Sequence, residues 1–234
     1  MTDQRTAPPG GAGYSYWFVV IAAFFVTALI TANITSVKII GLFSFVVDAG
    51  VVIFPISYIF GDILTEVYGY RRARQVIWLG FFCNLLAVGA ITLSGALPAA
   101  GIWDGQEAYN TILGYAPRLL FASFCAYLIG EFVNSYVLAK MKIATNGRWL
   151  WSRTIGSTLV GQGLDSLVFV VLAFSGTVPT GVLIGIIVVN WLFKSAYEAA
   201  ATPLTYLVVN FLKRRENLDV YDRDTSFNPF LVTR

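Results

Sequence analysis

The stretch VVNWLFKSAYEAAATPLTYLVV, residues 188–209, indicates the fold class of this chain. It is apolar almost throughout, and an uninterrupted apolar run of this length is typical of a membrane-spanning helix. The exceptions, Asn190, Lys194 and Glu198, follow one another at four-residue spacing. That spacing places them on roughly one face of a helix. The rest of the sequence indicates what this polar face contacts.

The composition supports a membrane protein. Of the 234 residues, 57% are hydrophobic and 12% are charged, whereas soluble domains carry about 25% charged residues. Apolar windows of about 20 residues recur along the chain, which predicts an all-α polytopic membrane protein rather than a barrel of short alternating strands. The chain has no histidine and only two cysteines, both in apolar segments. We therefore expect no metal, no cofactor and no structural disulfide.

We predict six transmembrane helices, near residues 15–36, 50–68, 74–96, 118–140, 154–176 and 180–212. Basic residues cluster after the second and sixth segments and between the fourth and fifth. The positive-inside rule then places these loops and both termini in the cytoplasm. The predicted parts are a disordered cytoplasmic N-terminal tail at 1–14, a six-helix transmembrane domain at 15–215 and a cytoplasmic C-terminal tail at 216–234.

Two prolines bear on the number and shape of the predicted helices. The last segment is about 50 Å long as a helix, and dividing it into two spans would give seven crossings and export its basic end. We therefore expect one long helix, tilted or kinked at Pro203. Pro55 is expected to kink the second helix.

Polar residues recur at helical spacing inside four of the predicted spans. They are Asp62 and Glu66, Glu131 and Asn134, Gln162 and Asp165, and Asn190, Lys194 and Glu198. A charged side chain costs at least about 2.5 kcal/mol at mid-bilayer, so we expect these residues to face one another around a cavity. The alternative is that such residues only join helices by hydrogen bonds. We prefer that alternative for Asn84 and Asn210.

The polar set also indicates the kind of cargo. Carboxylates and carboxamides suit a cation or a small molecule rich in N–H donors, and nearby rings suit a flat one. The predicted substrate-binding residues are Asp62, Glu131, Asn134, Gln162, Asp165, Asn190, Lys194, Phe54, Tyr58 and Trp191. Gating or coupling is predicted for Glu66, Glu198 and Asn33, with a headgroup-level pair to Arg71 or Arg72 as the alternative for Glu66. A buried carboxylate could instead carry a coupling proton.

Several function classes are disfavoured. The chain lacks a Walker A motif, a GxSxG motif and an HExxH motif. An intramembrane aspartyl enzyme built on Asp62 and Asp165, or a scaffold, is the least favoured interpretation. The net charge of +3 comes mainly from loop residues, which indicates topology rather than binding of nucleic acid. The partners we expect are a lipid membrane and, from the polar residues and rings described above, a purine-like small molecule. Small residues such as Gly181 and Gly185 permit close helix contact within a subunit or in a homodimer.

One segment resembles a known family. FPISYIFGDILTEVYGYRRAR, residues 54–74, contains the pattern D-x-x-x-E-x-Y-G-x-x-x-A-R. With NITSVKII (33–40), GEFVNSYVLAKMK (130–142), GSTLVGQGLDSLVFV (156–170) and VVNWLFKSAYEA (188–199), it resembles the bacterial queuosine-precursor transporters, also called the vitamin uptake transporter family. The resemblance runs from about residue 30 to residue 215. The first pattern is fairly specific, and the other segments match more loosely.

The resemblance implies a protein of the bacterial inner membrane that takes up 7-cyano- or 7-aminomethyl-7-deazaguanine. It implies that Asp62, Glu131, Gln162, Asp165 and Lys194 line the purine site. Family members resemble the binding subunits of energy-coupling-factor vitamin importers but are thought to act without the ATPase module. We therefore predict a self-sufficient carrier, facilitative or proton-coupled, and keep a binding subunit that needs a separate ATPase module as the alternative.

Overall fold

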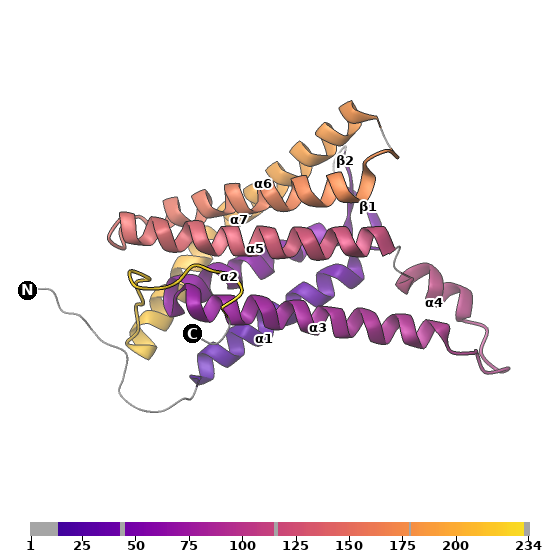
Figure 1. Ribbon diagram of the computed structural model, residues 1–234, viewed down its shortest axis with the longest axis horizontal. Helices are drawn as coiled ribbons and strands as arrows, with labels where there is room; N and C mark the ends of the chain where they lie inside the picture. The colour runs from indigo at the N-terminus through magenta and orange to yellow at the C-terminus, as the bar shows by residue number, and fades with distance from the viewer. Residues whose placement is uncertain (1–13, 43–44, 115–116, 178, 232–234) are drawn as a thin grey trace, which may run out of the picture.

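The computed structural model describes residues 14–42, 45–114, 117–177 and 179–231 (Figure 1). The described residues form six helices that are long and apolar enough to cross a membrane, as predicted. They are α1 (Tyr16–Thr35), α2 (Phe54–Tyr68), α3 (Tyr70–Ala96), α5 (Pro117–Ala144), α6 (Leu150–Phe174) and α7 (Thr180–Glu216). The all-α class and the six spans are confirmed. The predicted N-terminal tail, residues 1–14, lies outside the described residues except for Tyr14.

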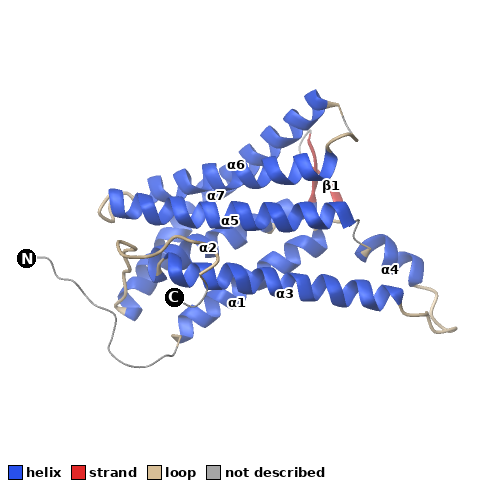
Figure 2. Cartoon of the chain, viewed as in Figure 1, coloured by secondary structure: helices blue, strands red, loops and turns tan. Residues whose placement is uncertain are grey.

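Smaller elements connect these helices (Figure 2). Between α1 and α2 lie the antiparallel strands β1 (Ile39–Leu42) and β2 (Phe45–Asp48), followed by the 3₁₀ helix η1 (Ala49–Val52). The sequence analysis did not predict this hairpin. The short helix α4 (Gln106–Leu113) lies between α3 and α5.

Two predictions about proline have different outcomes. Helix α2 begins at Phe54, so Pro55 occupies its first turn and does not kink it. The predicted kink is wrong because the first-turn N–H groups of a helix have no intrahelical acceptor, and proline is tolerated there. Helix α7 is one continuous helix of 37 residues with Pro203 inside it. The single long final helix is confirmed.

The molecule has two distinct ends along the helix axes (Figure 1). We call one the hairpin end: it holds β1, β2, α4 and the connection between α6 and α7. We call the other the basic end: it holds the start of α1, the α2–α3 turn, the α5–α6 loop and the C-terminal segment. The basic clusters used for the topology prediction all lie at this second end. Two predicted spans separate each cluster from the next, so the clusters are expected on the same side.

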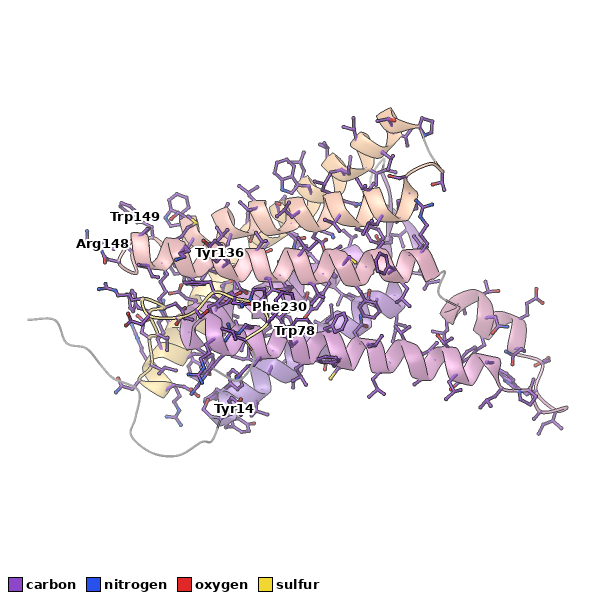
Figure 3. All side chains as sticks on the ribbon, in the orientation of Figure 1. Tyr14, Trp78, Tyr136, Arg148, Trp149 and Phe230 are labelled. Carbon is purple, nitrogen blue, oxygen red and sulfur yellow. The ribbon has the colours of Figure 1, made fainter. Side chains whose placement is uncertain are left out.

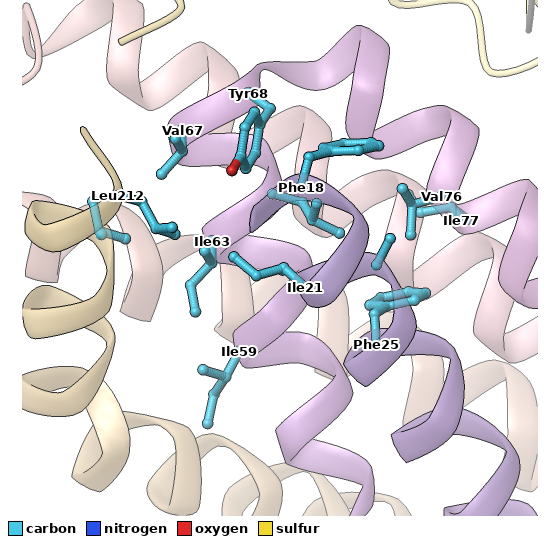
Figure 4. Close-up of a cluster of buried hydrophobic side chains, with 14 of the residues drawn as sticks. Phe18, Ile21, Phe25, Ile59, Ile63, Val67, Tyr68, Val76, Ile77 and Leu212 are labelled. Carbon is cyan, nitrogen blue, oxygen red and sulfur yellow. The ribbon is translucent and has the colours of Figure 1, made fainter. Parts of the chain in front are cut away.

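A hydrophobic cluster joins α1, α2, α3 and α7 toward the basic end (Figure 4). Phe18 and Phe25 of α1 pack against α2 and α3, where Ile63 and Ile77 are buried. Leu212 extends the cluster to α7. Helix α2 is thus enclosed by its neighbours, which explains how its polar residues come to be buried in the interior.

The C-terminal segment, residues 217–231, packs across the basic end. The Asp222 carboxylate accepts a hydrogen bond from the Tyr70 backbone N–H at 2.9 Å and so caps α3. The Trp78 indole donates to the Pro229 carbonyl at 2.8 Å, and Phe230 lies beside it (Figure 3). The turn beneath this segment needs glycine, because Gly69 has φ of 84° and a Cβ there would lie 2.7 Å from Val220.

Candidate functional site

A cavity of about 820 Å³ lies toward the hairpin end, where its lining includes Val37 and Val182. Its apolar wall comes mainly from α5, α6 and α7, including Leu120, Phe169 and Ile186. The polar groups in its lining are Asn33, Ser36, Asp48, Ser123, Asp165, Asn190 and Lys194. Pockets for small molecules usually measure about 300–1,000 Å³ and combine apolar walls with a few polar groups, so this cavity has the size and lining of a ligand site.

An ion pair lies in the lining of this cavity. The Lys194 ammonium on α7 lies 2.8 Å from the Asp165 carboxylate on α6. The same ammonium lies 4.5 Å from the centre of the Phe54 ring on α2. The side chains of Lys194 and Asp165 are 15% and 4% exposed, so little water screens the pair. A carboxylate acceptor, an ammonium donor and an aromatic ring thus meet at one place in the cavity.

A second group of polar residues lies deeper and does not line the cavity. The side chains of Asp62, Glu131, Asn134 and Gln162 are all buried there. The Asn134 amide donates to Asp62 Oδ1 at 2.7 Å, and the Thr158 hydroxyl donates to Glu198 Oε1 at 2.7 Å. Four helices, α2, α5, α6 and α7, therefore contribute to one buried polar cluster. The helical spacing predicted that these residues face one another around a cavity, but their side chains pack in the interior and do not line the cavity described above.

A close crossing of α5 and α6 brings these residues together. A Cβ on Gly161 would lie 2.7 Å from Asn134 Cβ and 3.0 Å from the Gly130 carbonyl oxygen. A Cβ on Gly130 would lie 2.8 Å from Asp165 Cβ. Small residues at such a crossing let two backbones approach. The glycines therefore place Glu131 and Asn134 beside Gln162 and Asp165.

The predicted substrate-binding residues divide into three groups. Asp165, Asn190, Lys194 and Phe54 line the cavity, together with Asn33, for which gating was predicted. Trp191 lies outside the cavity lining, and its indole donates to the Leu159 carbonyl at 2.9 Å. The residues of the deeper buried cluster are Asp62, Glu131, Asn134, Gln162 and Tyr58.

Glu66 lies at the centre of a third polar layer, at the basic end. Its carboxylate lies 2.8 Å from Arg153, 2.6 Å from Lys213 and 3.6 Å from Lys142. The predicted alternative of a pair with Arg71 or Arg72 is wrong, because α2 turns Glu66 inward toward α5, α6 and α7. We call Glu66, Lys142, Arg153, Lys213 and Asp219 the ion cluster.

The sequence analysis missed the basic members of the ion cluster as site residues. It assigned Lys142, Arg153 and Lys213 only to loop charge. Yet the side chains of Lys142 and Arg153 are both 1% exposed, and Lys142 also donates to the Val220 carbonyl at 2.7 Å. The C-terminal segment adds Asp219, which lies 2.6 Å from Lys142. The available signal was the position of these basic residues at helix ends facing a buried glutamate.

Comparison with known proteins identifies the family. Residues 48–208 match the family described as "Putative vitamin uptake transporter". The chain belongs to the vitamin uptake transporter family. A probable queuosine precursor transporter of Bacillus subtilis is 31% identical over 81% of this chain and 83% of its own length. The queuosine precursor transporter of Escherichia coli is 25% identical over 66% of this chain and 67% of its own length. No solved structure gives a significant match.

Family membership fits the three polar layers. A vitamin uptake transporter with six apolar spans is a multi-pass protein of the bacterial inner membrane. The cavity lies toward the hairpin end, the polar cluster lies deeper, and the ion cluster lies at the basic end.

Proposed function

We propose that this chain takes up queuosine precursors, the flat bases 7-cyano- and 7-aminomethyl-7-deazaguanine, as a self-sufficient carrier. The names of the related proteins support the substrate class. The observation that carries the proposal is the Asp165–Lys194 pair beside the Phe54 ring in the cavity lining. The carboxylate accepts from the N–H edge of a guanine-like base, the ammonium donates to a ring acceptor, and the phenyl ring stacks on the flat face.

The direction of transport follows from the proposed orientation. We place the basic end in the cytoplasm, since Arg71, Arg72, Lys140 and Arg148 lie there beside membrane-spanning helices. The cavity then opens to the outside. In this state the carrier would bind a base from outside, while the ion cluster keeps the cytoplasmic side closed.

Binding and uptake by the purified chain test the function. Wild-type protein in detergent should be stabilised against heat by 7-cyano-7-deazaguanine, because a ligand that binds only the folded state stabilises it by about 2.7 kcal/mol at a hundredfold excess over Kd. Adenine should give no shift. Asp165→Asn should remove the shift, whereas Glu107→Gln, which changes an exposed acid on α4, should keep it. A shift in Asp165→Asn equal to that in wild type would contradict the site.

Reconstitution separates the carrier from the alternative of a binding subunit. Liposomes that contain only this chain should take up the labelled base. Binding without uptake would instead favour a subunit that needs a separate ATPase module.

Cysteine labelling tests the orientation. In a background where Cys83 and Cys125 are serine, Ser123→Cys in the cavity should react with an impermeant thiol reagent added to intact cells. Asp224→Cys, exposed at the basic end, should react only after permeabilisation. The reverse pattern would overturn the orientation.

A further inference from the structure

Three buried carboxyl groups lie between the cavity and the ion cluster. They are those of Asp62, Glu131 and Glu198, which are 1%, 0% and 4% exposed. Within the part of the chain that the structure describes, the ion pairs of the interior join Lys194 to Asp165 on one side and the cations of the ion cluster to Glu66 on the other. None of these ion pairs includes Asp62, Glu131 or Glu198. An unpaired buried charge is costly, and such groups tend to bind a proton instead.

The geometry singles out two of the three. One oxygen of Asp62 accepts from Asn134, and one oxygen of Glu198 accepts from Thr158. Both donors come from the α5–α6 crossing, where Gly161, three residues after Thr158, meets Asn134. The two carboxyl groups therefore lie at the same crossing, and Glu198 Oε2 is buried there without a hydrogen-bond partner in the described residues. Two ionised carboxylates cannot hydrogen-bond, since neither has a donor. Two neighbouring buried carboxyl groups that each accept from one donor and belong to none of the ion pairs named above therefore favour one bound proton over two charges.

Further polar atoms around the pair have no partner of their own. They are both carboxyl oxygens of Glu131 and the Tyr58 hydroxyl, all fully buried. Buried polar groups are nearly always hydrogen-bonded. Unpartnered groups next to a carboxyl pair supply donors and acceptors for a proton that moves through the cluster.

We propose that Asp62 and Glu198 form a proton-binding pair that couples substrate uptake to proton entry. This rests on the proposed function. The pair holds one shared proton when α2 and α7 are together. Opening the basic end separates these helices, which the Glu66–Lys213 ion pair also joins. Water then reaches both carboxylates, the shared hydrogen bond breaks and one proton leaves to the cytoplasm.

The charged and titratable groups near the pair come from each helix around it. Helix α2 contributes Tyr58 and Glu66, α5 contributes Glu131, α6 contributes Asp165, and α7 contributes Lys194. The described helix α1 carries no acidic or basic residue. Glu66, Asp165 and Lys194 have their own ionic partners, so Glu131 and Tyr58 are the remaining groups that can exchange the proton with the pair.

Infrared spectroscopy of the purified protein without substrate tests the shared proton. Wild type should show the carbonyl stretch of a protonated carboxyl group, with the band shifting in heavy water. Asp62→Asn and Glu198→Gln should each remove the same band, because the two residues share one proton. Glu131→Gln should remove a different band, and the exposed control Glu107→Gln should remove none. If wild type has no such band, or if the first two variants leave all bands in place, the pair is not a proton site.

Proteoliposomes test the coupling. A gradient of about one pH unit, acidic at the cavity side, should drive roughly tenfold accumulation of 7-cyano-7-deazaguanine by wild type. Glu198→Gln should retain exchange of labelled for unlabelled base at equal pH and lose the gradient-driven accumulation. Equal accumulation with and without the gradient, or persistent accumulation in Glu198→Gln, would overturn the coupling. Absence of any uptake by wild type would count against the proposed function, whereas the infrared result tests the proton site independently of transport.

Discussion

The hairpin end and the basic end both bury charged side chains, but the first surrounds them with a cavity and the second with further charged groups. At the hairpin end, a single ion pair, Asp165–Lys194, lies in a wide cavity with apolar walls. At the basic end, Glu66 contacts three cations, and residues 217–231 pack across the helix ends. Both ends bury charge beside α2 and α7, but only one leaves space. Under the proposed carrier function, this difference corresponds to one state of the carrier, with the closed side held by ionic contacts.

The largest expected effect comes from breaking the closed end. Glu66→Gln removes the anion from a cluster whose side chains Lys142 and Arg153 are both 1% exposed. Removing one partner of a buried ion pair costs about 3–5 kcal/mol, because the remaining charge stays buried without compensation. We expect a clear loss of thermal stability in detergent. Glu107→Gln, an exposed acid at the hairpin end, is the matched control, and an equal loss in both variants would contradict the assignment.

The next effect concerns the close crossing of α5 and α6, which lies between the two ends. In Gly161→Ala the new methyl group meets Asn134 and the Gly130 backbone, and overpacking of this kind costs about 1–3 kcal/mol. It should also move α5 from α6 and weaken binding of the base, since Asp165 follows one turn later. Gly89→Ala on α3 has open space around its Cβ and should not destabilise. Thermal unfolding with and without ligand measures both effects, and wild-type behaviour in Gly161→Ala would contradict the close crossing.

A smaller effect is expected where the C-terminal segment meets α3. Asp222→Ala removes the acceptor for the Tyr70 backbone N–H, and loss of a helix N-cap costs about 1 kcal/mol. Asp222→Asn keeps an acceptor oxygen and should lose less. Limited proteolysis should then cut the C-terminal segment faster in the alanine variant than in the asparagine variant. Equal rates in both variants and wild type would show that the cap does not hold the segment.

Residue spacing predicted the membrane spans and the polar helix faces well. The apolar windows gave six helices, because each span must bury its own backbone in lipid and therefore needs a continuous apolar run. The i, i+4 spacing of Asp62 and Glu66 correctly placed both on a face turned from lipid. It did not predict that the two side chains have different surroundings. Asp62 meets Asn134 and Glu66 meets Arg153, and these partners come from other helices whose rotation no local pattern fixes.

The hairpin and the C-terminal segment escaped prediction for a different reason. Both strands are four residues long, and their segment was assigned to the connection between two helices. The C-terminal segment contains charged and turn-forming residues typical of a tail, and it is ordered by contacts with α3 and α5. Trp78 and Arg74 reach its backbone carbonyls, and such long-range contacts leave no periodic trace in sequence.

The smallest effect tests how the C-terminal segment joins the ion cluster. Burial opposes ionisation of Asp219, but Lys142 and Lys213 outweigh it and lower the pKa of this carboxyl below its ordinary value. A lowered folded-state pKa means that the stabilisation is present above the ordinary aspartate pKa of about 4 and is lost as pH falls through the folded-state pKa. The Asp219 side chain is 40% exposed, so solvent screening limits the contribution to at most about 1 kcal/mol. Wild type should therefore melt slightly above Asp219→Asn at neutral pH, and the difference should vanish in acid. The exposed control Asp224→Asn should match wild type, and a difference between wild type and Asp219→Asn that grows in acid would reverse the assigned sign.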